Sequence, residues 1–267
     1  MLNSLFVALA ASLAVRAHRE LRSRERLAAA SLEVLLNAID ANDRTTGAHV
    51  RRVADYALRL ARAAGLDERG QRSVERVALF HDIGKIHAAL FDIVHEGTRL
   101  NAHERELIAT HPQRGADVLR PLARFYPDLW QGVLAHHERW NGTGYPRALR
   151  GADIPLTARI VAIADTFDVI THSRPYKAGQ GAREAAAAIR EGRGTQFDPA
   201  LVDIFLSPSV FRGIERSMRP RSRPPPPLGG RRRAASPPTR APDVTFRWRT
   251  EGLVHRAPDH STQTPPR

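Results

Sequence analysis

The stretch from residue 136 to residue 146 constrains this chain more than any other, because two adjacent histidines precede a loop broken by glycines. It reads His-His-Glu-Arg-Trp-Asn-Gly-Thr-Gly-Tyr-Pro. Successive side chains on a helix diverge by about 100°. Both imidazoles can therefore reach one place only if two metal ions lie there or if the helix ends there. A pair with one buried and one exposed histidine is the alternative, but the stretch as a whole favours a dinuclear metal centre.

Two further segments carry candidate ligands beside apolar helical sequence. His81-Asp82 ends a helical pattern, and a carboxylate there could bridge two cations, although an isolated His-Asp pair is more often a surface pair or a cap. Asp165 lies in an apolar stretch, where an unpaired buried carboxylate costs several kcal/mol. A cation would remove that cost, and a salt bridge to Arg159 or Arg174 is the competing explanation.

The composition restricts the kind of metal site. The chain has no cysteine, so thiolate ligands, disulfides and a cysteine nucleophile are excluded. Histidine and carboxylate ligands suit Fe, Mn or Zn better than soft metals. Absence of cysteine also fits a cytoplasmic protein.

Two observations predict an all-α fold. Apolar residues repeat at helical spacing, and aromatic residues, which favour strands, make up only 6% of the chain. We expect His49 in the first turn of a helix, His111 at a helix end because Pro112 follows it, and the histidine pair in the last turn of another. The expected helices cover about residues 27–39, 47–64, 68–80, 102–110, 129–138, 154–170, 182–190 and 199–206, with an irregular connection at 87–100.

The two ends of the chain differ from this central part. Residues 1–15 are apolar and are followed by arginines, but about 14 apolar residues are shorter than the ~20 that span a bilayer. We expect residues 1–26 either to attach the protein to the inner face of the membrane or to pack as a helix on the chain or a partner. Residues 219–267, with eleven Arg against three acidic residues and many prolines, are expected to be disordered. Nucleic-acid binding is indicated only by this basic tail.

Taken together, the motifs resemble those of the HD-GYP family, a branch of the HD metallophosphohydrolases. The resemblance covers about residues 32–206 and predicts a domain at 27–218. Its blocks are His81-Asp82-Ile83-Gly84-Lys85, the stretch 136–146 with its signature-loop residues Asn141, Gly142, Gly144, Tyr145 and Pro146, the stretch Ile154–Asp165, Arg174–Lys177 and Gly194–Pro199.

The resemblance implies an HD-type helical bundle with two divalent ions, Fe or Mn, that hydrolyses cyclic di-GMP, either as far as linear pGpG or further to GMP. It implies that Asp82 and Lys85 are catalytic and that Lys85, Arg174 and Lys177 bind the substrate phosphates. Attack by a hydroxide bridging the two ions is the implied mechanism. The implied metal ligands are His49, His81, Asp82, His111, His136, His137 and Asp165, with Asp82 bridging.

Three departures from the family pattern bear on function. Thr45 stands where some members have a glutamate ligand for a third metal, so we predict two metals. Asn141 replaces the usual aspartate of the signature loop, and His95-Glu96-Gly97 replaces a Lys-Pro-Gly.

The alternatives are therefore a weakly active or inactive module that binds cyclic di-GMP or a diguanylate cyclase domain, and an HD hydrolase of another nucleotide or cyclic dinucleotide. The sequence indicates no oligomeric state.

Overall fold

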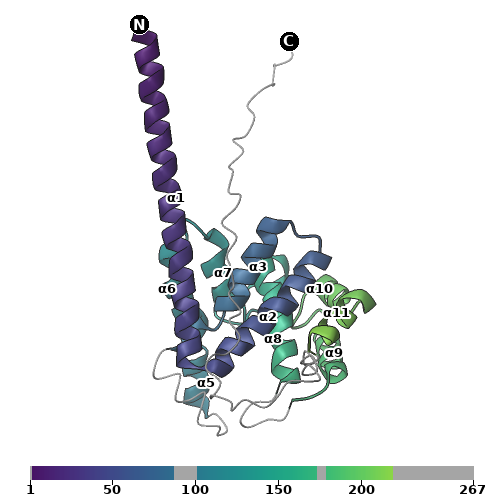
Figure 1. Ribbon diagram of the computed structural model, residues 1–267. Helices are drawn as coiled ribbons and strands as arrows, with labels where there is room; N and C mark the ends of the chain where they lie inside the picture. Colours follow the sequence, from purple (N-terminus) through teal and green to yellow (C-terminus); the bar gives the residue numbers. More distant parts are fainter. Residues whose placement is uncertain (1, 87–100, 173–178, 219–267) are drawn as a thin grey trace, which may run out of the picture. The chain divides into compact units, whose positions relative to one another are not determined.

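The computed structural model describes residues 2–86, 101–172 and 179–218, with residues 2–11 and 42 described by their backbone alone. Within these ranges the chain contains helices and no strand, which confirms the predicted all-α fold (Figure 1). The expected disordered tail lies outside the described residues. The helices are α1 (Leu2–Asn42), α2 (Arg44–Ala63), α3 (Glu68–Phe80), α5 (Ala102–Ile108), α6 (His111–Leu119), α7 (Pro127–Ala135), α8 (Leu156–Thr171), α9 (Ala182–Glu191), α10 (Pro199–Phe205) and α11 (Pro208–Met218), with 3₁₀ turns η1 (Ile83–Ile86), η2 (Arg120–Leu122) and η3 (Gly151–Asp153).

Helix α1 is continuous where the sequence predicted a separate N-terminal segment and a helix from residue 27. No proline or glycine occurs in Leu2–Asn42, and most of its residues are strong helix formers. Its first part, up to Ala30, belongs to one compact unit and the described residues from Ser31 onward to another. None of the described helices combines the length and the apolar composition that crossing a bilayer requires.

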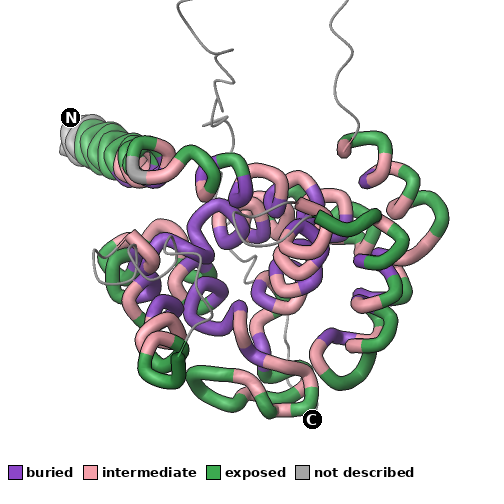
Figure 2. Tube along the Cα trace, turned by 90° about the horizontal axis from the view of Figure 1, so that it is seen from below, coloured by how far each residue is buried: buried purple, intermediate pink, exposed green. Residues whose placement is uncertain are grey.

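The core of the larger unit is built around α2, α3 and α8. Helix α2 packs on α3 and α8, and α3 packs on α7 and α8. The ring of Phe167 on α8 lies 5.2 Å from that of Tyr56 on α2 and 5.5 Å from that of Phe205 on α10, so one aromatic side chain joins three helices. In Figure 2 the buried positions gather on the inner sides of these helices. This packing holds α2, α3 and α8 in fixed positions, and each carries candidate ligands.

Two helix starts differ from the sequence predictions and change where ligands sit. Helix α2 begins at Arg44, because the Asp43 carboxylate caps it by accepting hydrogen bonds from the backbone N–H groups of Thr45 and Thr46 at 2.8 and 2.9 Å. His49 thus lies in the second turn. Helix α6 begins at His111, whereas we expected a helix to end there. Proline is well tolerated in a first turn, where its missing N–H has no intrahelical acceptor to lose.

Two other helices also differ from the sequence predictions. Helix α7 ends at Ala135, so His136 caps it and His137 lies beyond it, whereas we placed both in its last turn. Helix α11 was not predicted at all.

Gly84 allows η1 to lie directly against the start of α6. A Cβ at this position would lie 2.1 Å from the carbonyl oxygen of His111 and 2.8 Å from the backbone nitrogen of Gly115. The backbone of Gly84 is not in the left-handed region, so the glycine is required for close packing rather than for a tight turn. The contact fixes His81 and Asp82 relative to His111.

Candidate metal centre

Two groups of three ligand atoms lie side by side in the interior of the bundle. One consists of His49 from α2, His81 from the end of α3 and Asp165 from α8; the other consists of His111 from α6 and His136 and His137 from the end of α7. Within each group the ligand atoms lie within 4.8 Å of one another. We call them the first triad and the second triad. The helices bring together side chains that are more than a hundred residues apart.

Asp82 lies between the two triads and faces both. Its Oδ2 atom is 3.9 Å from Nε2 of His49 and 3.6 Å from Nε2 of His81, whereas its Oδ1 atom is 3.3 Å from Nε2 of His111. One carboxylate oxygen is thus directed at each triad. This is the arrangement that a carboxylate bridging two cations requires.

The backbone fixes the orientation of three of the imidazoles. The Nδ1–H groups of His81, His111 and His136 donate to the carbonyl oxygens of Ala78, Ile108 and Val133, each three residues earlier, at 2.8, 2.7 and 2.6 Å. With Nδ1 protonated, a neutral imidazole carries its lone pair on Nε2. All three Nε2 atoms are therefore available as ligand atoms.

The polar atoms of the centre converge on points that suit a cation. Nε2 of His49 and of His81 are buried without a hydrogen-bond partner. Nε2 of His111 lies 3.1 Å from Nε2 of His136, so two lone pairs face each other. Buried polar atoms normally have partners, and facing lone pairs repel. Because a divalent cation in each triad would satisfy all four atoms, the residues fit two metal ions.

The electrostatics of the site favour binding of cations at His136, His137 and Asp165, whereas His49 must first lose a proton. Burial opposes the charged form of His49, but Asp165 and Asp168 outweigh this and raise its pKa to about 9. Burial and the neighbouring imidazoles hold the pKa of His136 well below its usual range, and burial together with His111 lowers the pKa of His137 to about 3. Burial opposes ionisation of Asp165, but the contact with His49, whose Nε2 atom lies 3.3 Å from Oδ1, nevertheless lowers the pKa of this carboxyl to about 2. Neutral imidazoles and ionised carboxylates are the protonation states that metal ligands need.

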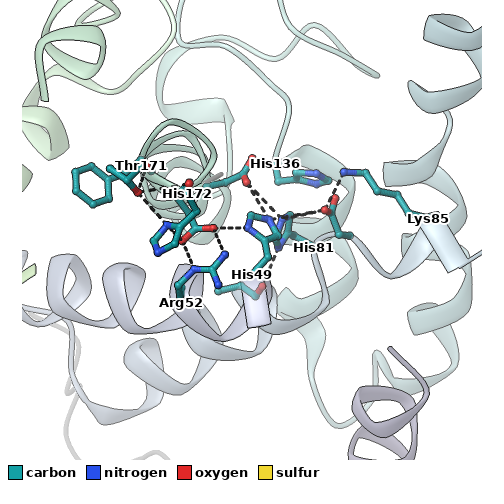
Figure 3. Close-up of polar contacts among 12 residues, drawn as sticks. His49, Arg52, His81, Lys85, His136, Thr171 and His172 are labelled. Carbon is teal, nitrogen blue, oxygen red and sulfur yellow. Dashed lines mark hydrogen bonds and ion pairs between the residues drawn. The ribbon is translucent and has the colours of Figure 1, made fainter. Parts of the chain in front are cut away.

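His49 differs from the other imidazoles, because a carboxylate orients it. Its Nδ1 lies 2.7 Å from Oδ2 of Asp168, while its Nε2 lies 3.3 Å from Oδ1 of Asp165. Asp168 is only 1% exposed. Arg52 donates to it through Nε at 2.7 Å and through a terminal nitrogen at 2.8 Å, and Nδ1 of His172 lies 3.0 Å away (Figure 3).

Lys85 reaches the centre from η1. Its Nζ atom lies 2.8 Å from Oδ2 of Asp82, and Figure 3 shows the side chain extending toward the histidines. The side chains that keep some contact with solvent are those of Lys85, Asp165, His137 and Tyr145. These residues lie on the open side of an otherwise buried site.

The signature loop is held by the buried carboxylate of Glu138. Glu138 is 4% exposed, and its two carboxylate oxygens accept hydrogen bonds from the backbone N–H groups of Arg147 at 2.7 Å and Leu149 at 3.0 Å. The Tyr145 ring stacks on His137 with centroids 4.9 Å apart. Gly144 permits this course, since a Cβ there would lie 2.3 Å from the backbone nitrogen of Arg139 and 2.6 Å from the carbonyl oxygen of His137.

A second segment supports the same loop. The backbone N–H groups of Trp140 and Asn141 donate to the carbonyls of Gln196 and Thr195 at 3.1 and 2.9 Å. The Arg159 guanidinium pairs with Asp198 at 2.7 Å, which removes the salt bridge to Arg159 that we considered for Asp165. The motif at residues 194–199 therefore has a structural role, because it holds the start of the signature loop in place.

The structure describes most of the predicted site residues and places them in one centre. All seven candidate ligands and Lys85 come together. Arg174, the alternative salt-bridge partner of Asp165, and Lys177 lie outside the described residues. Asp168 and Glu138 were missed as site residues. An aspartate one turn after Asp165 was the only available signal for the first, and nothing in the sequence signalled the second.

Comparison with known proteins places the chain in a family. The family model described as HD domain matches residues 33–201, well over half of the chain. The chain belongs to the HD domain family. The resemblance to HD-GYP proteins is confirmed by the same match and by the relatives that follow.

Two curated relatives and one solved structure illustrate what this HD domain is similar to. It is 38% identical over 173 residues to 3'3'-cGAMP-specific phosphodiesterase 2 of Vibrio cholerae, which covers 64% of this chain and 33% of that protein. It is 37% identical over 188 residues to the cyclic di-GMP phosphodiesterase response regulator RpfG of Xanthomonas campestris, and the alignment covers 70% of this chain and 49% of that protein. The crystal structure of a cyclic GMP-AMP specific phosphodiesterase of V. cholerae aligns with a TM-score of 0.50 at 27% identity over 68% of this chain and 49% of that one. The chain thus spans half or less of the length of these proteins.

Proposed function

We propose that this HD domain is a metal-dependent phosphodiesterase that cleaves a cyclic dinucleotide, with cyclic di-GMP as the first candidate substrate. The observation that carries the proposal is the pair of triads on either side of Asp82, with one carboxylate oxygen directed at each. Proteins that bind a single structural ion have no need of a second set of ligands at this spacing.

The proposed ligands are His49, His81 and Asp165 for one ion and His111, His136 and His137 for the other, with Asp82 shared. Imidazole and carboxylate donors without thiolate fit Fe or Mn. When bound, the two ions would supply Lewis acidity toward a phosphodiester and would make nearby water more acidic.

The protein's own contributions are positive charge, orientation and exclusion of water. Lys85 is placed to direct an ammonium group at a phosphate oxygen, because its Nζ atom already lies at the shared carboxylate. Tyr145, stacked on His137 at the open side, can limit how a substrate approaches. We further propose that Arg174 and Lys177 bind the phosphates, as the family resemblance implies.

The relatives support a cyclic dinucleotide substrate and name two of them. One of the two curated relatives described above is named for cyclic di-GMP and the other for 3'3'-cGAMP. Both compounds contain the same kind of phosphodiester, so the metal centre would treat them alike. The choice between them depends on contacts to the bases.

The test is purification under reducing, anaerobic conditions, followed by metal analysis and by product identification with cyclic di-GMP and with 3'3'-cGAMP. We expect two metal ions per chain and conversion of at least one of the two compounds to a linear dinucleotide or to mononucleotides. An Asp82→Asn variant should lose turnover. Absence of turnover with either compound in a protein carrying two metals would refute the enzymatic proposal and favour a binding module.

A further inference from the structure

The two triads are not chemically equivalent, and the difference lies outside the ligands. Three imidazoles, those of His81, His111 and His136, donate Nδ1–H to a neutral backbone carbonyl. His49 donates to the carboxylate of Asp168. We propose that Asp168 is a positioning residue that sets the metal affinity of the first triad and leaves that of the second triad unchanged. This inference rests on the metal centre of the proposed function.

The position of Asp168 follows from its place on α8. It stands one helical turn after Asp165, so both carboxylates project from the same side of the helix. They contact opposite edges of one imidazole: Asp165 lies 3.3 Å from Nε2 and Asp168 lies 2.7 Å from Nδ1 of His49. The contact joins residues 119 positions apart in the chain. One carboxylate is placed to share the metal, and the other fixes the ring that faces it.

The carboxylate of Asp168 is itself immobilised. Arg52 binds both of its oxygens, and His172 lies against one of them (Figure 3). Arg52 stands three residues after His49 on α2, so α2 supplies both the ligand and the group that holds the ligand's partner. A rotation of Asp168 away from His49 would break these contacts together.

A carboxylate acceptor changes a histidine ligand more than a carbonyl does. It fixes the tautomer and the ring orientation, and it makes the imidazole a stronger donor toward a metal. Because only His49 has such a partner among these four imidazoles, the effect belongs to the first triad. The second triad should not respond, because its His111 and His136 are oriented by backbone atoms that a side-chain substitution leaves in place.

Asp168 also joins α2 to α8 through Arg52, so a purely structural role must be separated from positioning. Asp198 offers a matched control. It is buried and pairs with an arginine, Arg159, at 2.7 Å. Asp198 touches none of the imidazoles among its described contacts. Its loss should reduce stability without a selective effect on one metal.

The experiment is a titration of chelator-stripped full-length protein with Mn²⁺ by calorimetry, together with thermal unfolding of each apo-protein. We expect the wild-type chain and Asp198→Asn to bind two equivalents alike. In Asp168→Asn one equivalent should weaken by about 10–100-fold, the usual effect of losing such a partner, while the other is unchanged. Unchanged binding of both equivalents, or equal weakening of both, would overturn the inference.

A second variant covers the case in which Asp168→Asn does not fold. Arg52→Lys keeps a positive charge beside Asp168 but loses the two-point contact that orients it. Because the Arg52 side chain is 31% exposed, we expect the chain to fold with this change. We expect a smaller loss at the same single equivalent, and wild-type binding at that equivalent would overturn the inference. If the wild-type protein binds no Mn²⁺ at all, the proposed function fails instead.

Discussion

Glu138 gives the clearest prediction about how the signature loop is held. In Glu138→Gln only one side-chain oxygen remains to accept the two backbone N–H groups of Arg147 and Leu149, and an NH₂ group faces the other donor. A buried donor left without a partner costs about 1–3 kcal/mol. We therefore expect the free energy of unfolding to fall by about 1–3 kcal/mol in Glu138→Gln. In Glu138→Ala, where both donors lose their acceptor, we expect about 2–6 kcal/mol.

The measurement is urea unfolding of the metal-free chain, followed by turnover of the metal-loaded chain. Turnover should fall as well, because Tyr145 lies on the segment that Glu138 holds against His137. Glu104→Gln is the matched control. Among the described residues, Glu104 accepts one hydrogen bond, from the exposed backbone N–H of Asn101, so its loss should be small. If Glu138→Gln lost less than about 0.5 kcal/mol, the size of an ordinary surface change, the reasoning would be refuted.

Three further predictions concern the same site. Gly144→Ala should reduce turnover strongly, because its Cβ would meet backbone atoms at 2.3–2.6 Å, whereas Gly213→Ala, with the nearest atom at 3.5 Å, should leave turnover unchanged; equal effects would contradict this. Asn141→Asp should turn over at the wild-type rate. Oδ1 of Asn141 accepts hydrogen bonds from the backbone N–H and the hydroxyl of Thr143, and a carboxylate oxygen can accept the same two bonds. A large gain in turnover would show that the charge at this position matters. Lys85→Met should abolish most turnover while metal analysis still finds two ions, and loss of metal instead would assign Lys85 to assembly of the site.

The full set of seven candidate ligands was predicted through the resemblance to the HD-GYP family, whose motifs lie in short segments. His81-Asp82 and His136-His137 are pairs whose neighbours show helical periodicity, and although each pair alone also fits a surface or partly buried position, the pairs taken together indicate a metal centre. Asp165 stands out because it interrupts an apolar face. Periodicity found the helices that carry these residues, except α6, which begins at His111 where we expected a helix to end. The resemblance of the segments to the HD-GYP family therefore predicted which residues meet.

What surrounds the ligands could not be predicted, because it depends on contacts between distant parts of the chain. Asp168 has its partners on α2, and no local pattern says which face of α2 it meets. Glu138 accepts from backbone groups, which carry no sequence signal. The start of α2 was placed at residue 47 instead of Arg44, because Asp43 was not recognised as the residue that caps the helix. Pro112 was similarly read as ending a helix when it stands in the first turn of one.

The most direct test of the central claim is anomalous diffraction from crystals of the anaerobically purified protein, measured at the Fe and Mn edges. We expect two peaks, typically ~3.5–4 Å apart for such centres, one within each triad and both beside Asp82. A single peak, no peak, or a third peak near Thr45 would contradict it.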